Sequence, residues 1–205
     1  MSSSTDGTVY IVDDDAAVRQ SLSLLMRSMK LEVATFASAQ DFLAACVDDL
    51  CGCLVLDIRM PGMSGLDLQT ELGRRRVALP IIFITGHGDV GMAVRAMKAG
   101  AVDFIEKPFS DQQLLDRIQQ ALAQCRAGRS ARAARATIEA RLTTLSPRER
   151  EVMQRIVIGQ ANKVIALELG LSERTVEIHR AKVMSKMAVR SVAELVSAVR
   201  HAQAD

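Results

Sequence analysis

The sequence predicts an α/β domain with a doubly wound, five-stranded parallel sheet, followed by a smaller all-helical domain. In residues 1–124, short runs rich in Val, Ile and Leu alternate with stretches of helical periodicity, the pattern of a parallel sheet covered by helices on both faces. Residues 145–205 instead carry a series of helix start and stop signals. A chain of 205 residues is long enough for one medium and one small domain, each with its own core.

Polar residues follow the apolar runs. We expect strands at 9–12, 32–36, 54–57, 80–84 and 102–106. The residues at or just after four of their ends are Asp13 and Asp14, Asp57, Thr85, and Lys107. In a sheet of this kind, ligands bind outside the carboxyl ends of the strands, where the strand order reverses. The sequence therefore predicts that these side chains converge on one cleft.

The intervening helices have recognisable caps and apolar faces. Asp15 precedes Ala16 and Ala17, so we interpret it as an N-cap rather than a ligand. Later helices are predicted to start after Ser38, to pass through residues 68–72, to cover 90–99 and to start after Ser110. Gly100 is placed to end the fourth helix.

Three carboxylates in one cleft repel one another unless a hard divalent cation takes oxygen ligands from them. Asp13, Asp14 and Asp57 therefore imply a metal. Lys107 adds a point charge and Thr85 a hydroxyl donor, a combination that suits an anionic group carried by one carboxylate. The chemistry predicted for the cleft is that of a phosphate stabilised by Mg²⁺.

Four separated motifs carry a resemblance to a known family. They are Ile-Val-Asp-Asp-Asp at 11–15, Leu-Asp-Ile-Arg-Met-Pro-Gly-Met-Ser-Gly at 56–65, Ile-Thr-Gly at 84–86 and Lys-Pro-Phe at 107–109. Together they resemble the flavodoxin-like receiver domain of two-component response regulators, over residues 8–124. The resemblance implies that Asp57 is the phosphoacceptor and that Thr85 and Lys107 contact the phosphoryl group. It also implies a Mg²⁺ site formed by Asp13, Asp14, Asp57 and the backbone carbonyl of Arg59.

Two neighbours of the cleft remain open. Arg59 and His87 lie two residues past Asp57 and Thr85, at positions that in receivers tune the lifetime of the acyl phosphate. They are either lifetime determinants or solvated loop residues. An aspartyl-phosphate hydrolase is an alternative function, but it needs a second acid two residues after the nucleophile, and Arg59 stands there. A further alternative is a phosphorylation-dependent module whose C-terminal domain binds protein or RNA.

Charge divides the chain. Residues 1–124 hold 11 Lys and Arg against 16 Asp and Glu, whereas residues 125–205 hold 15 against 8. A basic C-terminal part indicates a nucleic-acid partner for that part alone. The four cysteines form no CxxC pair, so we expect reduced thiols and no zinc site. Without an apolar N-terminal or membrane-length run, the protein is expected to be cytoplasmic, with no membrane partner.

The domain boundaries follow from composition. Residues 1–7 are polar and predicted to be disordered, and residues 125–144 are rich in Ala and Arg, which favours a helical, solvated linker. Arg129, Arg132 and Arg135 form a stripe that either faces solvent or touches DNA or the receiver. The final domain is assigned to residues 145–205.

The final domain has four predicted helices. The first is capped by Ser146 with Glu149, the second covers 162–169 and stops at Gly170, the third begins at Ser172 and the fourth at Ser191. This layout is a helix-turn-helix. The segments at 145–152, 162–169 and 172–179 resemble the LuxR-type DNA-binding domain, which with a receiver is similar to the NarL/FixJ class and its FixJ-like branch.

Helical angles divide the third helix of this domain into two faces. Val176, Val183 and Met187 fall on one arc and should be buried. The opposite arc should face the major groove. The residues expected to contact DNA bases or phosphates are Lys163, Arg174, Thr175, Glu177, Ile178, Ala181, Lys182 and Lys186. His179 lies beside the buried arc and is either a structural residue or a base reader.

The resemblance implies a regulatory sequence of events. A sensor histidine kinase donates the phosphoryl group, Thr85 moves inward, and Phe104 rotates into the vacated space. The fourth helix, fifth strand and fifth helix then form a homodimer surface, so that paired domains bind promoter DNA and reach RNA polymerase. The chain is thus expected to be a transcriptional regulator and not an enzyme beyond its own phosphorylation and slow dephosphorylation.

Overall fold

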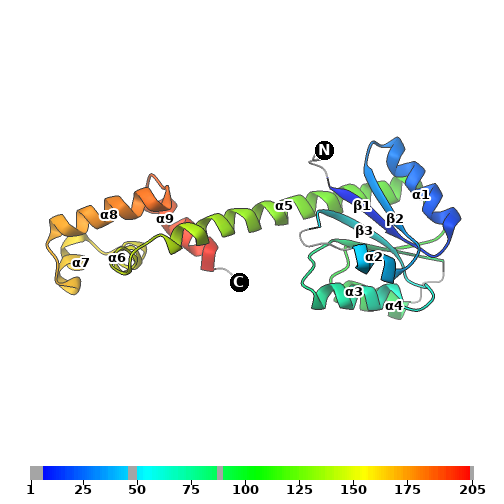
Figure 1. Ribbon diagram of the computed structural model, residues 1–205, viewed down its shortest axis with the longest axis horizontal. Coiled ribbons are helices and arrows are strands. Elements are labelled where there is room, and N and C mark those ends of the chain that lie inside the picture. The colour runs from blue at the N-terminus through cyan, green and yellow to red at the C-terminus, as the bar shows by residue number, and fades with distance from the viewer. Residues whose placement is uncertain (1–6, 46–49, 87–89, 204–205) are drawn as a thin grey trace. The chain divides into compact units, whose positions relative to one another are not determined.

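The computed structural model describes residues 7–45, 50–86 and 90–203. The chain divides into two compact units, Met1–Arg129 and Ser130–Asp205, which are described separately below (Figure 1).

The N-terminal unit contains a parallel sheet with the order β2-β1-β3-β4-β5. Its strands are β1 Thr8–Val12, β2 Glu32–Phe36, β3 Gly52–Asp57, β4 Ile81–Thr85 and β5 Asp103–Glu106. The five predicted strands are confirmed, with β5 one residue shorter than expected. From β1 the chain first moves outward to β2 and then returns to the other side of β1 at β3, so the strand order reverses between β1 and β3. Asp13 directly follows β1, and Asp57 is the last residue of β3.

Helices cover both faces of this sheet (Figure 1). They are α1 Ala16–Ser28, α2 Ala39–Ala45, α3 Gly65–Arg74, α4 Val90–Lys98 and α5 Asp111–Thr143. On one face Met26 of α1 and Ile118 of α5 pack against Ile11 and Ile84. On the other face Phe42 and Leu72, from α2 and α3, pack in a second core. The two separate cores confirm the doubly wound architecture.

The predicted caps at Asp15, Ser38 and Ser110 are present. Asp15 accepts a hydrogen bond from the backbone N–H of Ala17, which confirms its role as the N-cap of α1. The hydroxyl groups of Ser38 and Ser110 accept from the backbone N–H groups three residues later. Ser64 forms a further capping box with Asp67 at the start of α3, a cap that the sequence analysis missed.

Two glycines allow close backbone contacts. A Cβ atom at Gly65 would lie 2.3 Å from the carbonyl oxygen of Asp57, and one at Gly52 would lie 1.8 Å from that of Thr8. Any larger residue at either position would displace the backbone of β3 or its neighbour. Gly7, assigned to the disordered N-terminal segment, is in fact buried beside Gly52, while residues 1–6 lie outside the described residues.

The predicted linker is helical because α5 runs without interruption from Asp111 to Thr143. Apolar residues near both of its ends are packed rather than solvated. Cys125 is buried in the N-terminal unit at 4% exposure, and Ile138 and Leu142 pack against the core of the C-terminal unit. Apolar residues at both ends of an Ala- and Arg-rich segment therefore attach it to both units.

The C-terminal unit contains α6 Pro147–Val157, α7 Asn162–Leu169, α8 Glu173–Met187 and α9 Val192–Gln203. The predicted capping box of Ser146 and Glu149 begins α6, Gly170 ends α7 with φ 63°, and Ser172 caps α8. Buried residues from all four helices form one core, including Val152, Ile165, Val176 and Leu195. Among the described residues, no helix combines the length and apolar character that crossing a membrane requires.

Candidate functional site

The strand-end site is organised around Lys107. Its ammonium group lies 2.8 Å from Asp13 Oδ2 and 3.1 Å from Asp57 Oδ1, although the three residues come from different strand ends. The second oxygen of each carboxylate accepts a backbone hydrogen bond, from Asp15 at 2.9 Å and from Arg59 at 2.7 Å. The side chains of Asp13 and Asp57 are only 2% and 9% exposed. The predicted convergence of these side chains is therefore observed.

Burial and charge act against each other at this site. Burial raises the pKa of Asp57 above its ordinary value, the hydrogen bond and charge of Lys107 oppose that rise, and the negative charge of Asp13 adds to it. Burial also lowers the pKa of Lys107, but Asp13 and Asp57 together more than offset the decrease, so it lies above its ordinary value. The site thus holds a buried carboxylate whose charge is incompletely compensated by one ammonium group.

Thr85 and Phe104 lie on neighbouring strands. Thr85 ends β4 and is 1% exposed, and its carbonyl oxygen accepts from the backbone N–H of Lys107 at 2.7 Å. Phe104 is partly buried against the core on the α3 and α4 side of the sheet. Because β4 and β5 are paired in register, with Phe83 opposite Phe104, Thr85 and Phe104 lie on the same face. Their predicted roles in switching require that arrangement.

The remaining predicted ligands lie at the rim. Asp14 is exposed and, with Arg59, lines an open pocket of about 630 Å³ that also includes Met60, Pro61 and Arg95. Arg59 is exposed, and its backbone N–H is turned to Asp57. Within residues 7–45, 50–86 and 90–203, no group of three or more Asp, Glu, His or Cys side chains is arranged as a metal site. In this structure the ammonium group of Lys107 bridges Asp13 and Asp57. His87 lies outside the described residues.

Arg19 supports the acidic loop and was not predicted. Its Nη1 donates to the backbone carbonyl oxygens of Asp13 and Asp14 at 2.8 and 2.9 Å. These bonds hold the backbone of the loop between β1 and α1. The only signal in the sequence is an arginine on the first turn of a helix that follows an acidic loop.

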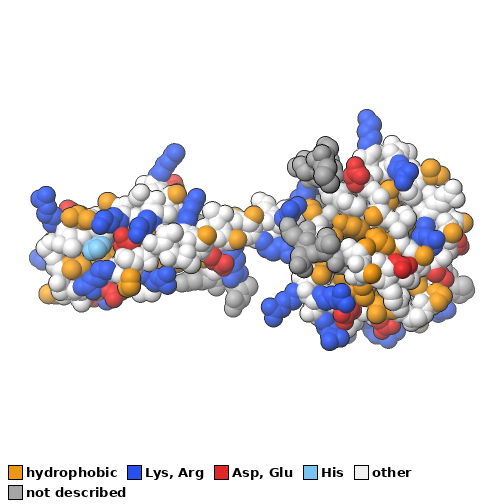
Figure 2. All heavy atoms as spheres, viewed as in Figure 1, with side chains coloured by type: hydrophobic (Ala, Val, Ile, Leu, Met, Phe, Trp, Pro, Cys, Tyr) orange, Lys and Arg blue, Asp and Glu red, His pale blue; other side chains and the backbone are white. Residues whose placement is uncertain are grey.

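The second candidate site is the exposed face of α8. Val176, Val183 and Met187 are at most 1% exposed, which confirms the predicted buried arc. The residues predicted to face the groove are exposed, namely Arg174, Glu177, Ile178, Ala181 and Lys182. Thr175 is half-buried, and its backbone N–H and hydroxyl group bond to Ser172. Lys163 of α7 is exposed. Figure 2 shows Lys and Arg side chains spread over the visible face of this unit, with fewer acidic groups.

Lys186 is exposed, but its ammonium group is bonded to other parts of the domain. Its ammonium group donates to Glu149 Oε2 at 2.6 Å and to the carbonyl oxygen of Thr144 at 3.0 Å. Glu149 is 4% exposed, and its pKa falls to about 2 because Lys186 and the backbone N–H of Ser146 both donate to it. The two residues border an open pocket of about 480 Å³ with Ala181, Lys182 and Ser185. Lys186 therefore links α8 to the cap of α6.

His179 is half-buried beside the core, and its Nδ1 atom is buried without a hydrogen-bond partner among the described residues. This position matches the expectation that it lies at the edge of the buried arc.

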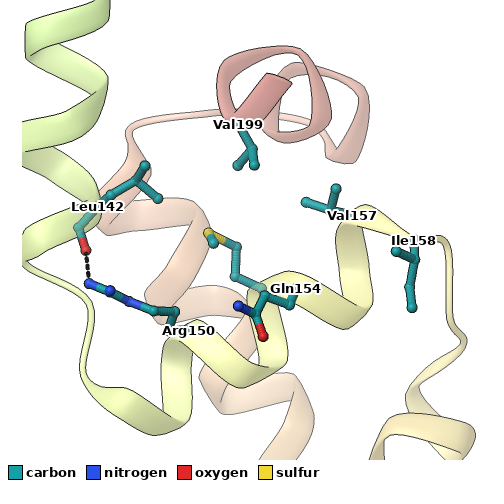
Figure 3. Close-up of a pocket in the computed structure, with 7 residues that line it drawn as sticks. Leu142, Arg150, Gln154, Val157, Ile158 and Val199 are labelled. Atoms are coloured by element: carbon teal, nitrogen blue, oxygen red, sulfur yellow. Dashed lines mark hydrogen bonds between the residues drawn. The ribbon is translucent and has the colours of Figure 1, made fainter. Parts of the chain in front are cut away.

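A further pocket of about 410 Å³ lies between the end of α5, α6 and α9 (Figure 3). Leu142, Val157 and Val199 line it, and Arg150 donates to the carbonyl oxygen of Leu142 at 3.0 Å. No residue predicted to contact DNA lines this pocket.

Two family models match the chain. Residues 9–119 match the response regulator receiver domain, and residues 143–199 match the bacterial regulatory proteins of the luxR family. The chain belongs to the two-component response regulators. Its site residues at the strand ends and its exposed α8 lie within the two matched segments.

Named relatives and solved structures agree with this assignment. This response regulator is 52% identical to nodulation protein W of Bradyrhizobium diazoefficiens, over 94% of this chain and 85% of that protein. It is 46% identical to the transcriptional regulatory protein FixJ of the same organism, over 94% of both chains. The structure of response regulator StyR has a TM-score of 0.87 and 49% identity, covering 94% of this chain and 98% of that one. These findings show a transcriptional response regulator of the NarL/FixJ class, which implies a sensor kinase partner and DNA binding.

Proposed function

We propose that Asp57 accepts a phosphoryl group from a phosphohistidine of a sensor kinase and that this modification controls promoter binding by α8. The observation that supports the proposal most strongly is the Lys107 ammonium within hydrogen-bond distance of both Asp13 and Asp57. It holds a positive charge beside the carboxylate that would become the phosphorylated group.

The reaction is an in-line displacement. One carboxylate oxygen of Asp57 attacks phosphorus, an O–P bond forms, and the P–N bond to the kinase histidine breaks with its electron pair left on the imidazole nitrogen. Lys107 pairs with the negative charge that develops on the phosphoryl oxygens, and the hydroxyl group of Thr85 donates to one of them. Return to the starting state is hydrolysis of the same acyl phosphate.

The donor set at the site fits Mg²⁺. Asp13 and Asp57 are buried carboxylates, the negative charge of Asp13 helps to raise the pKa of Asp57, and Asp14 adds an exposed carboxylate at the rim. We propose that these three carboxylates and the carbonyl oxygen of Arg59 hold the ion. When bound, Mg²⁺ neutralises charge on the transferring phosphoryl group.

The proposed output runs through the face formed by α4, β5 and α5. After phosphorylation Thr85 moves toward the phosphoryl group and Phe104 follows, biasing one of two packings of that face. Its apolar residues on α4 are already exposed, with Val90 at 81% and Met97 at 45%. We propose that a second copy covers them, which favours a homodimer on phosphorylation.

The proposed domain boundaries place a receiver at 8–124, a helical linker at 125–144 and a DNA-binding domain at 145–205.

For DNA recognition, α8 is proposed to enter the major groove. Glu177 accepts from a cytosine amino group, Ile178 and Ala181 contact thymine methyl groups, and Lys163, Arg174 and Lys182 contact phosphates or base edges. Thr175 and Lys186, near the two ends of α8, are proposed to contact the phosphate backbone of the DNA. RNA polymerase is the proposed next partner of the DNA-bound dimer.

The phosphorylation site is tested by treating the full-length protein with phosphoramidate and Mg²⁺, followed by mass spectrometry. A single hydroxylamine-labile phosphoryl group is expected on the wild type and none on Asp57→Asn. The matched control is Asp116→Asn, which removes an exposed carboxylate of α5 and should be phosphorylated normally. An equally phosphorylated Asp57→Asn protein would exclude Asp57 as the acceptor.

Base recognition is tested by selection of random DNA with the wild type and with variants of α8. Exchanging Glu177, Ile178 and Ala181 should change the preferred sequence. The control Lys163→Ala should lower affinity for all sequences and reduce the salt dependence of log K by about one unit. If the exchange lowers affinity without changing the preferred sequence, base recognition lies elsewhere.

A further inference from the structure

Two cysteines meet at the end of the sheet opposite Asp57. Cys51 directly precedes β3, and Cys125 lies in α5, so 74 positions separate them. Their Sγ atoms are nevertheless 3.5 Å apart. A disulfide bond is about 2.05 Å long, so closure requires an approach of roughly 1.5 Å. Cys51, Cys53 and Cys125 are not in disulfide bonds in this structure.

The backbone around the two sulfur atoms is held on both sides. The backbone N–H of Gly52 donates to Cys125 Sγ at 3.2 Å, which attaches the start of β3 directly to α5. The carbonyl oxygen of Cys51 accepts from the backbone N–H of Thr8 at 3.0 Å, and Gly52 is pressed against the Thr8 backbone. Since neither chain segment can move away easily, a small rotation of the Cys51 side chain is the main movement that closure requires.

The neighbouring thiol is a poor competitor. Cys53 is completely buried, and burial together with the charge of Cys125 raises its pKa to about 12. Cys51 is only partly buried, so a small oxidant reaches its sulfur from solvent. Cys125, at 4% exposure, is less accessible than Cys51. Access therefore makes Cys51 the first thiol to react and Cys125 the one that resolves it.

We propose that Cys51 and Cys125 form a reversible intramolecular disulfide when the protein meets a peroxide. The Cys51 thiolate attacks a peroxide oxygen, giving a sulfenic acid as the O–O bond breaks and one water leaves. The Cys125 sulfur then attacks Cys51 Sγ, the S–S bond forms, and the sulfenic oxygen leaves as a second water. Hydrogen peroxide gains two electrons and two protons, and the two thiols lose them. A small dithiol reductant reverses the bond.

The disulfide would act on the last receiver turns of α5. Cys125 lies four residues before Arg129, where the N-terminal unit ends, so the bond would attach this part of α5 to the start of β3. It would also close a large loop of the unfolded chain. The oxidised receiver should melt higher, on the order of 5–10 °C, as expected for a long closed loop in a domain of this size. Amide exchange in residues 121–129 should slow.

The experiment titrates full-length protein with hydrogen peroxide, blocks remaining thiols by alkylation, and maps the cysteines by mass spectrometry. The expected product has lost two hydrogen atoms, contains a Cys51–Cys125 peptide pair, and returns to the reduced mass with dithiothreitol. Cys51→Ser should abolish this product. The matched control Cys53→Ser, two residues along the same segment, should still form it.

Several outcomes would overturn the proposal. They are a disulfide between Cys46 and Cys51, a cross-link between two chains, accumulation of sulfinic acid at Cys51 without a cross-link, and an unchanged mass under excess peroxide. Because Cys51→Ser removes the less buried partner, a folded variant is expected, and its unaltered amide exchange before oxidation checks this. Asp57→Asn should form the disulfide as readily as the wild type, so the result does not depend on phosphorylation.

Discussion

Replacing Lys186 with Met separates a structural role in α8 from a role on DNA. The substitution keeps the apolar stem of the side chain and removes its ammonium group. Glu149 then loses the partner at 2.6 Å and keeps its hydrogen bond from the backbone N–H of Ser146 at 2.9 Å. The result is a buried carboxylate with less compensation, at the point where α8 meets the cap of α6.

The expected cost follows from the exposure of both partners. A hydrogen bond to a charged group contributes about 1.5–3 kcal/mol. The Glu149 side chain is 5% exposed but that of Lys186 is 37% exposed, so solvent screening places the cost near the lower limit, at about 1.5 kcal/mol. At that value, amides of α6 and α8 that exchange by unfolding of their domain should exchange about tenfold faster.

The lowered pKa of Glu149 determines how the cost of Lys186→Met changes with pH. The folded pKa of Glu149 is about 2, below its ordinary value of 4.5, so the pair stabilises the fold above pH 4.5. That contribution is lost as pH falls from about 4.5 to about 2, because over this range the unfolded state binds a proton that the folded state does not. The difference between Lys186→Met and the wild type should therefore be constant above pH 5 and shrink below pH 4.5.

The assay is hydrogen exchange of the full-length protein, resolved by peptide. Lys182→Met is the matched control, since Lys182 is on the same helix and its side chain makes no hydrogen bond or ion pair with the described residues. It should leave exchange in α6 and α8 unchanged and weaken DNA binding. Equal exchange rates for Lys186→Met and the wild type at pH 7 would refute the structural role of the Lys186–Glu149 pair.

Two further predictions concern the receiver. In magnesium-free buffer at pH 7, Asp57→Asn should stabilise the receiver against urea unfolding by on the order of 1 kcal/mol. The substitution removes a buried negative charge, and the pKa of Asp57 is raised by that burial and by the nearby Asp13. A variant less stable than the wild type would contradict this explanation. Gly65→Ala should destabilise the receiver by about 3 kcal/mol or more and disturb phosphorylation, since its Cβ would lie 2.3 Å from the Asp57 carbonyl oxygen. Gly73→Ala, in the same helix with nothing within 4 Å, should instead stabilise by about 0.5–1 kcal/mol, and a similar effect of both substitutions on the unfolding midpoint would refute the packing argument.

Periodicity predicted most of the fold because it reports a local preference. The buried arc of α8, at Val176, Val183 and Met187, follows directly from 3.6 residues per turn. The convergence of Asp57 and Lys107 was also predictable, since parallel strands present their carboxyl ends at one edge of a sheet. The burial of Cys125 and Leu142 near the ends of the linker was not predictable. The Ala and Arg composition of the linker indicates a helix but does not say which of its residues pack against a core.

Specific contacts between residues far apart along the chain could not be predicted from the sequence. Lys186 and Glu149 are 37 positions apart, and each has a local explanation, as a phosphate contact and as a helix cap. Their pairing depends on how α6 and α8 cross in the folded domain. The same holds for Cys51 and Cys125, which no spacing rule connects. The convergence of Asp13 and Lys107 was predicted, but their direct ion pair at 2.8 Å depends on the strand register of the folded sheet.

The most direct test of the account measures promoter binding by the full-length protein before and after phosphorylation by phosphoramidate with Mg²⁺. For the wild type, affinity for a selected DNA site should rise at least about tenfold, which is a coupling of about 1.4 kcal/mol or more. For Asp57→Asn, the same treatment should leave affinity unchanged. An equal rise in both proteins, or no rise in a wild type shown to carry the phosphoryl group on Asp57, would contradict the claim that Asp57 controls DNA binding by α8.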